Sequence, residues 1–171
     1  MLITPHVLAG AALASIFPNS ISGKFAGFMV GWVSHYVLDA FPHWERLFGP
    51  HDNLDLRKKP YSKWPNHIFV QAFLDTIIGF SLLVWMSGRT DVYFCWQSAL
   101  FWGGAGGMLP DVLDNVPAWQ NYTKNVRLWR AIERLHRNVH IPAARQRKLP
   151  KYTGLITQLI TISASLYVIV K

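Results

Sequence analysis

The segment 34–44, SHYVLDAFPHW, carries side chains that can bind metals or transfer protons, inside a strongly apolar stretch of chain. His35 and Asp39 are four residues apart, and His43 follows four residues later. On a helix, residues at this spacing lie on one face, with Cβ atoms roughly 5–6 Å apart. His35 and Asp39 could therefore hold one metal ion from a single helix, or they could form a hydrogen-bonded pair at a helix end. His43 fits a wet interfacial side chain better than a ligand.

Similar residues occur in three other places along the chain. His6 lies in TPHVLAG, Asp111 and Asp114 lie in LPDVLD, and His136 and His140 lie in LHRNVH. The aspartates could also be helix caps, and the histidines could be interfacial residues. Imidazole nitrogen and carboxylate oxygen together suit Zn²⁺, with Mn²⁺ and Fe as alternatives. The candidate metal ligands, enough for one or two ions, are His6, His35, Asp39, Asp111, Asp114, His136 and His140.

The composition indicates what kind of protein must position these residues. The chain has 171 residues, of which 51% are hydrophobic and only 15% are charged, whereas ordinary soluble domains have roughly 25% charged residues. A single cysteine excludes an internal disulfide and a cysteine-based zinc site. The N-terminus does not read as a cleaved signal peptide. We expect one membrane-embedded helical domain, residues 1–171.

Five apolar segments are separated by turn signals, at about 4–17, 25–41, 68–86, 93–113 and 152–170. Crossing a bilayer as a helix takes about 20 apolar residues. The third and fifth segments meet this length, the second and fourth are borderline, and the first is short enough to be a partial or interfacial helix. The pattern predicts an all-α integral membrane bundle of about four to five hydrophobic helices. The alternative is a soluble all-helical protein with an apolar core.

The net charge of +8 is unevenly distributed. If all five segments span, the connections 42–66 and 115–151 lie on the same side as the N-terminus. These two connections hold five and nine Lys and Arg residues, whereas the opposite side holds only Lys24 and Arg89. Positive charge marks cytoplasmic loops. The N-terminus and both basic loops are therefore predicted to be cytoplasmic.

The segment 123–140 reads as an amphipathic helix on the cytoplasmic surface. Its arginines would face water or anionic headgroups, and His136 and His140 would face inward. Arg137, beside His136, could contact a phosphate. No nucleic-acid-binding motif accompanies the positive charge, so no specific nucleic acid partner is expected.

This topology brings the candidate ligands to one level, at the cytoplasmic ends of the segments. Asp75 lies about 12 Å deeper than His67. A carboxylate in the middle of an apolar segment needs a partner, so Asp75 is interpreted as an outer residue supporting the site. The motifs GFMVG and GGAGG place glycines four apart, a spacing typical of tight helix packing.

The motifs TPHVLAG, SHYVLDAFPHW, LPDVLD and LHRNVH together resemble those of the membrane-bound metal-dependent hydrolase family, which is distantly related to zinc-dependent phospholipase C. The resemblance implies a prokaryotic inner-membrane protein with a divalent metal held by the ligands named above. The sequence departs from the family in reading HRNVH, where that family commonly continues Gly-x-Thr-His-Ser after His-Arg. The motif order also differs.

The function that follows is hydrolysis of a phosphoester or lipid substrate at the cytoplasmic face, with Asp39 and Asp111 as the catalytic carboxylates. A bound metal activates water and polarises the oxygen of the substrate, and one aspartate accepts a proton. The alternative is a non-catalytic membrane subunit or scaffold that binds lipids and a protein complex and has structural histidines. The motifs of type-2 phosphatidic acid phosphatases and of covalent haem attachment are absent from the sequence.

Overall fold

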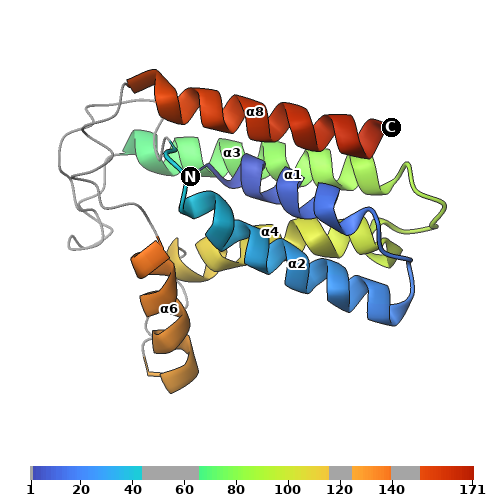
Figure 1. The fold of residues 1–171 in the computed structure, drawn as a ribbon, viewed down its shortest axis with the longest axis horizontal. Helices are drawn as coiled ribbons and strands as arrows, with labels where there is room; N and C mark the ends of the chain where they lie inside the picture. Colours follow the sequence, from blue (N-terminus) through green and yellow to red (C-terminus); the bar gives the residue numbers. More distant parts are fainter. Residues whose placement is uncertain (1, 44–65, 116–124, 140–150) are drawn as a thin grey trace.

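The computed structural model describes residues 2–43, 66–115, 125–139 and 151–171, and the regular secondary structure of these parts is entirely helical (Figure 1). They form six α-helices and one short 3₁₀-helix, and no strand occurs within the described ranges. The elements are α1 (Ile3–Ala14), α2 (Ile21–Asp39), α3 (Asn66–Ser87), η3 (Cys95–Gln97), α4 (Ala99–Asn115), α6 (Arg127–Val139) and α8 (Lys151–Val170). The predicted all-helical class is confirmed for these residues.

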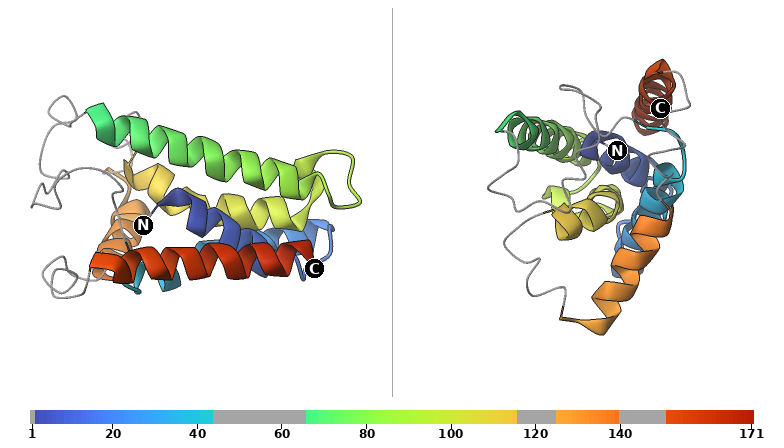
Figure 2. Two further views of the ribbon diagram at one scale, coloured as in Figure 1. Left: turned by 90° about the horizontal axis from the view of Figure 1, so that it is seen from above. Right: turned by 90° about the vertical axis from the view of Figure 1, so that its left-hand side faces the viewer.

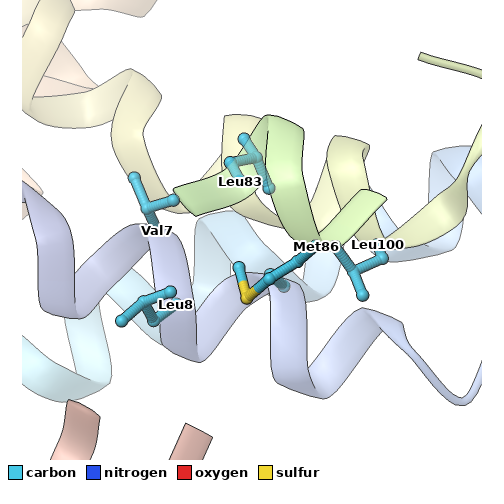
Figure 3. Close-up of a cluster of buried hydrophobic side chains, with 6 residues drawn as sticks. Val7, Leu8, Leu83, Met86 and Leu100 are labelled. Atoms are coloured by element: carbon cyan, nitrogen blue, oxygen red, sulfur yellow. The ribbon is translucent and has the colours of Figure 1, made fainter. Parts of the chain in front are cut away.

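The shortest apolar helix, α1, occupies the middle of the bundle and contacts α2, α3, α4 and α8. Its residues from Thr4 to Ala12 are all buried. Val7 and Leu8 of α1 form a core cluster with Leu83 of α3 and Leu100 of α4 (Figure 3). The sequence predicted a short segment at 4–17 that could lie at an interface. The helix is indeed short, but it lies inside the bundle.

The long helices alternate in direction, so the helix ends that carry the candidate ligands lie at the same end of the bundle. The N-terminus, the C-terminal ends of α2 and α4, and the starts of α3 and α8 all lie at one end of the bundle (Figure 1). The C-terminus of the chain lies at the other end, as the left view in Figure 2 shows. Helix α6 runs across the bundle direction at the end where the N-terminus lies. This arrangement brings His6, His35 and Asp111 to the same end.

Glycines allow the backbones of α1, α2 and α4 to touch one another. A Cβ atom added at Gly31 would lie 2.0 Å from the carbonyl oxygen of Gly103, and one at Gly10 would lie 2.3 Å from the same oxygen. A Cβ at Gly107 would lie 2.3 Å from the carbonyl oxygen of His6. Real side chains cannot occupy these positions without separating the helices. The tight packing predicted from the glycine spacing is therefore present.

Two helices are long and apolar enough to cross a membrane, over Phe69–Ser87 of α3 and Tyr152–Val170 of α8. Only 28% and 17% of the residues in their apolar windows are buried. A core helix of a soluble protein would be mostly buried, since burial is what stabilises apolar side chains in water. The exposed apolar surface of α3 and α8 suggests that the protein associates with a membrane.

Replacing Gly31 with alanine tests the backbone contact between α2 and α4. The new methyl group would overlap the backbone of Gly103, so we expect a loss of about 1–3 kcal/mol of stability. Thermal unfolding of the purified protein measures this loss. Gly88→Ala is the matched control, because its Cβ would meet no described atom closer than 3.4 Å. Equal melting temperatures for the two variants would contradict the tight packing.

Candidate metal centre

Five buried side chains from four helices meet at one end of the bundle. His6 comes from α1, His35 and Asp39 from α2, Asp111 from α4 and His136 from α6. The Asp39 carboxylate lies at the centre of the group. The Nε2 atoms of His35 and His136 lie 3.0 and 2.9 Å from its Oδ2, and Nε2 of His6 lies 3.3 Å from its Oδ1.

Asp111 lies near two of the same histidines, but farther from them than Asp39 does. Its Oδ1 is 3.9 Å from Nε2 of both His35 and His136. One atom each from His6, His35 and Asp111 can be chosen so that all lie within 4.8 Å of one another, and the same holds for His35, Asp39 and His136. The two groups share His35. The cluster therefore offers two overlapping sets of three ligand atoms.

The orientation of His35 is set by its Nδ1 atom, which lies 2.8 Å from the carbonyl oxygen of Gly107. A carbonyl oxygen can only accept, so Nδ1–H of His35 donates this hydrogen bond. In a neutral ring, Nε2 then carries a lone pair, directed toward Nε2 of His136 at 3.2 Å and toward Asp39. Histidine ligands of metals commonly have this arrangement, in which the second nitrogen donates to a backbone carbonyl.

His6 adds a third imidazole to the cluster. Its ring stacks on that of His35, with centroids 4.0 Å apart, and the side chain is fully buried. Among the described residues, Nδ1 of His6 has no hydrogen-bond partner. Three imidazoles packed this closely in an apolar bundle cannot all be protonated without strong mutual repulsion.

A divalent cation fits this donor set electrostatically. Two buried carboxylates, Asp39 and Asp111, carry a charge of −2 when ionised, and burial of uncompensated charge is costly. One ion of charge +2 would balance them while all three histidines stay neutral. The ion would also accept the lone pair of His35 Nε2, which otherwise faces the lone pairs of the Asp39 carboxylate. Of the predicted ligands, five therefore lie where they could hold a metal ion together: His6, His35, Asp39, Asp111 and His136.

The other predicted site residues cannot be placed in the cluster from the described part of the chain. His140 lies outside the described residues, and the side chains of Asp114 and Arg137 are likewise outside the described set. His43 is buried, with Nδ1–H donating to the carbonyl oxygen of Phe41 at 2.7 Å. It belongs to neither group of ligand atoms.

Asp75 lies against the N-terminus of α1 and has no position in either ligand group. It accepts hydrogen bonds from the backbone N–H groups of Ile3 and Thr4 and, at 2.7 Å, from the hydroxyl of Thr4. The first N–H groups of a helix lack partners within the helix. Asp75 of α3 therefore caps α1, the helix that carries His6, which gives this mid-segment aspartate its partner.

Two contributors to the site were not predicted from the sequence. The carbonyl of Gly107 orients His35, and the ring of Tyr36 packs edge-on against His35 and His136, at 5.6 and 5.8 Å between centroids. Indole Nε1 of Trp32 donates to the Tyr36 hydroxyl at 3.0 Å. A backbone carbonyl leaves no mark on the residue type, and Tyr36 follows His35 with no distinguishing pattern.

Comparison with known proteins gives no relative. The chain matches no protein-family model, and it has no significant match to a characterised protein or to a solved structure. The resemblance to metal-dependent membrane hydrolases therefore stays a hypothesis carried by the residues themselves.

Metal analysis of the purified protein tests the cluster directly. We expect bound divalent metal in the wild type and at least a roughly 10–100-fold loss of affinity in His35→Ala, since even residues that only support a ligand have effects of that size. Asp39→Ala should behave in the same way. His67→Ala is the control, because His67 is exposed. Wild-type protein that is metal-free after gentle purification and binds no added ion would exclude the site.

The cap on α1 predicts a separate effect of Asp75. Asp75→Ala removes the acceptor for two backbone N–H groups and a hydroxyl, so we expect about 1–3 kcal/mol of lost stability. Because α1 carries His6, metal affinity should also fall, although Asp75 contributes no ligand atom. Thermal unfolding and metal titration measure the two effects. Thr76→Ala is the neighbouring control, since its hydroxyl donates a hydrogen bond within α3, to the Ala72 carbonyl. A variant as stable as wild type would contradict the capping role.

Proposed function

We propose that this protein is an integral membrane hydrolase that uses a divalent metal, zinc in the first instance, to cleave a phosphoester or lipid-type substrate at the cytoplasmic face. The observation that carries the proposal is the convergence of three histidine Nε2 atoms on Asp39, with Asp111 beside them. Nitrogen and oxygen donors of this kind suit zinc. The resemblance described above points to the same chemistry.

The membrane location rests on charge and hydrophobicity. Helices α3 and α8 have the length and composition of membrane spans, and the basic connections follow the positive-inside rule. At the end away from the metal centre, exposed aromatic residues occur together with basic ones: Arg89 lies over the ring of Trp85, and Lys171 lies over that of Tyr167. Aromatic and basic residues favour the membrane–water boundary. If α1, α2 and α4 are also embedded in the membrane, the basic connections lie at one membrane surface. The aromatic and basic residues at the opposite end then lie at the other surface.

The two aspartates differ in a way that divides their roles. Asp39 is fully buried and within 3.3 Å of three imidazoles, which suits a metal ligand. Asp111 lies farther from His35 and His136 and is 8% exposed, so it is the better placed to accept a proton from attacking water. A divalent ion held by the cluster would polarise the substrate oxygen and acidify water. His35 is kept in position by Gly107.

Hydrolysis assays against lipid phosphoesters test the proposal. Protein in nanodiscs is supplied with a phosphatidylglycerol or a soluble nitrophenyl phosphodiester, with and without chelator. We expect turnover that zinc restores after chelation, and at least about a hundredfold loss in Asp111→Asn, the effect typical of removing a general base. His67→Ala should retain activity. Metal-dependent turnover that is unchanged in Asp111→Asn would exclude the assigned role of Asp111.

A second candidate is a non-catalytic membrane subunit with a structural metal, and the burial of the cluster favours it. His6, His35 and Asp39 have no exposed surface, whereas a catalytic metal needs a position open to substrate. Tightly bound metal with no hydrolysis, together with a melting temperature that falls on chelation, would support this candidate over the hydrolase.

A further inference from the structure

We propose that α6 lies in the headgroup region of an anionic membrane and that this docking completes the metal centre by holding His136 against Asp39. The inference rests on the proposed metal centre and adds its regulation: the lipid surface controls whether the last ligand is in place. Three features of α6 support this docking: its contact with the bundle, its exposed apolar face and its positive charge.

Helix α6 contacts α2 through His136. This side chain is 2% exposed, and its Nε2 atom lies 2.9 Å from Asp39 and 3.2 Å from His35. The other four members of the cluster belong to helices of the bundle. His136 alone among them comes from a helix that runs across the bundle (Figure 1). The position of α6 therefore decides whether the cluster has five members or four.

Much of the apolar face of α6 is exposed in the part of the chain that the structure describes. Leu128 and Leu135 are 71% and 52% exposed, and seven residues apart they lie on the same face, two turns from each other. Ile132 and Val139 continue this stripe and are only half-buried. Apolar side chains this exposed in water are unfavourable, whereas a helix lying in the membrane surface inserts them among the acyl chains.

The opposite face of α6 is basic. Arg127, Arg130 and Arg134 are all exposed, and Glu133 is the only acidic residue in the helix. Arginines on the polar side of a surface helix are attracted to anionic phospholipids. The helix lies crosswise at the end where α3 and α8 begin, which is where a membrane spanned by those helices would have its surface (Figures 1 and 2). An anionic bilayer is therefore the partner that fits both faces.

Lipid and metal then act on the same state of the protein. The docked helix presents leucines to lipid and His136 to the cluster at once. Anything that favours docking increases metal affinity, and bound metal increases the affinity of α6 for the membrane by the same factor. Anionic lipid is thus a positive effector of metal binding.

Spin labels on two faces of α6 test the docking. With the native cysteine removed by Cys95→Ser, nitroxides are attached at Leu128→Cys and, as the matched control, at Arg130→Cys. In nanodiscs containing phosphatidylglycerol, we expect the label at 128 to collide more with oxygen than with a water-soluble nickel chelate. The label at 130 should show the reverse. Equal, water-like accessibility at both positions would overturn the docking.

Zinc titration in nanodiscs of pure phosphatidylcholine, or with added phosphatidylglycerol, tests the coupling. We expect wild-type affinity to be at least about tenfold higher with the anionic lipid, because three arginines contribute, and this difference should shrink in 0.5 M salt. A variant with Arg127, Arg130 and Arg134 changed to Gln should bind zinc alike in both bilayers, as should His136→Ala. Equal wild-type affinity in both would overturn this inference and leave the metal centre standing. If zinc binds in neither bilayer, the proposed function is overturned, and the coupling between lipid and zinc is overturned with it. The spin-label experiment would then still show whether α6 docks on the membrane.

Discussion

The close approach of three helix backbones is the constraint on which the rest of this structure depends. Gly10, Gly31 and Gly103 meet where α1, α2 and α4 cross, with no space for a side chain between them. His6, His35 and Gly107 each lie four residues from one of these glycines. Each of these residues is about one helical turn from its glycine, so the glycine contact also fixes the distances between His6, His35 and Gly107. If the backbones lay farther apart, as larger residues would require, the imidazoles of α1 and α2 could not stack.

The same packing orients the ligands. Gly107 contributes twice: its missing side chain lets α4 approach the backbone of His6, and its carbonyl accepts the hydrogen bond from His35. Asp75 holds the start of α1 from the other side. Because these supports are backbone contacts or short polar side chains, the site is held by the rigid part of the bundle. Positioning by such supports is what metal sites and catalytic groups require.

Much of this could be read from the sequence because apolar segment length, glycine spacing and charge each have a direct physical meaning. The helical class follows from segment length, and the charge asymmetry predicted that the candidate ligands His35, Asp39, Asp111 and His136 lie at one end of the bundle. What the sequence could not give are relations between distant segments. That α1 is central rather than peripheral depends on its neighbours, since its own composition fits both places. The role of Asp75 depended on which helix start lies opposite it, and the carbonyl of Gly107 has no residue-type signal.

The ligands of the centre are widely separated along the chain, and this has a consequence for biosynthesis. His35 and His136 are 101 residues apart, yet their Nε2 atoms lie 3.2 Å from each other. A chain that grows from its N-terminus acquires His6, His35 and Asp39 early, whereas the ligand from α6 arrives only after four of the bundle helices have been made. The complete cluster therefore cannot form before α6 has been made, whereas α8, which packs against α1, is synthesised later still. An ion that needed all five side chains would therefore bind only after α1, α2, α4 and α6 had come together.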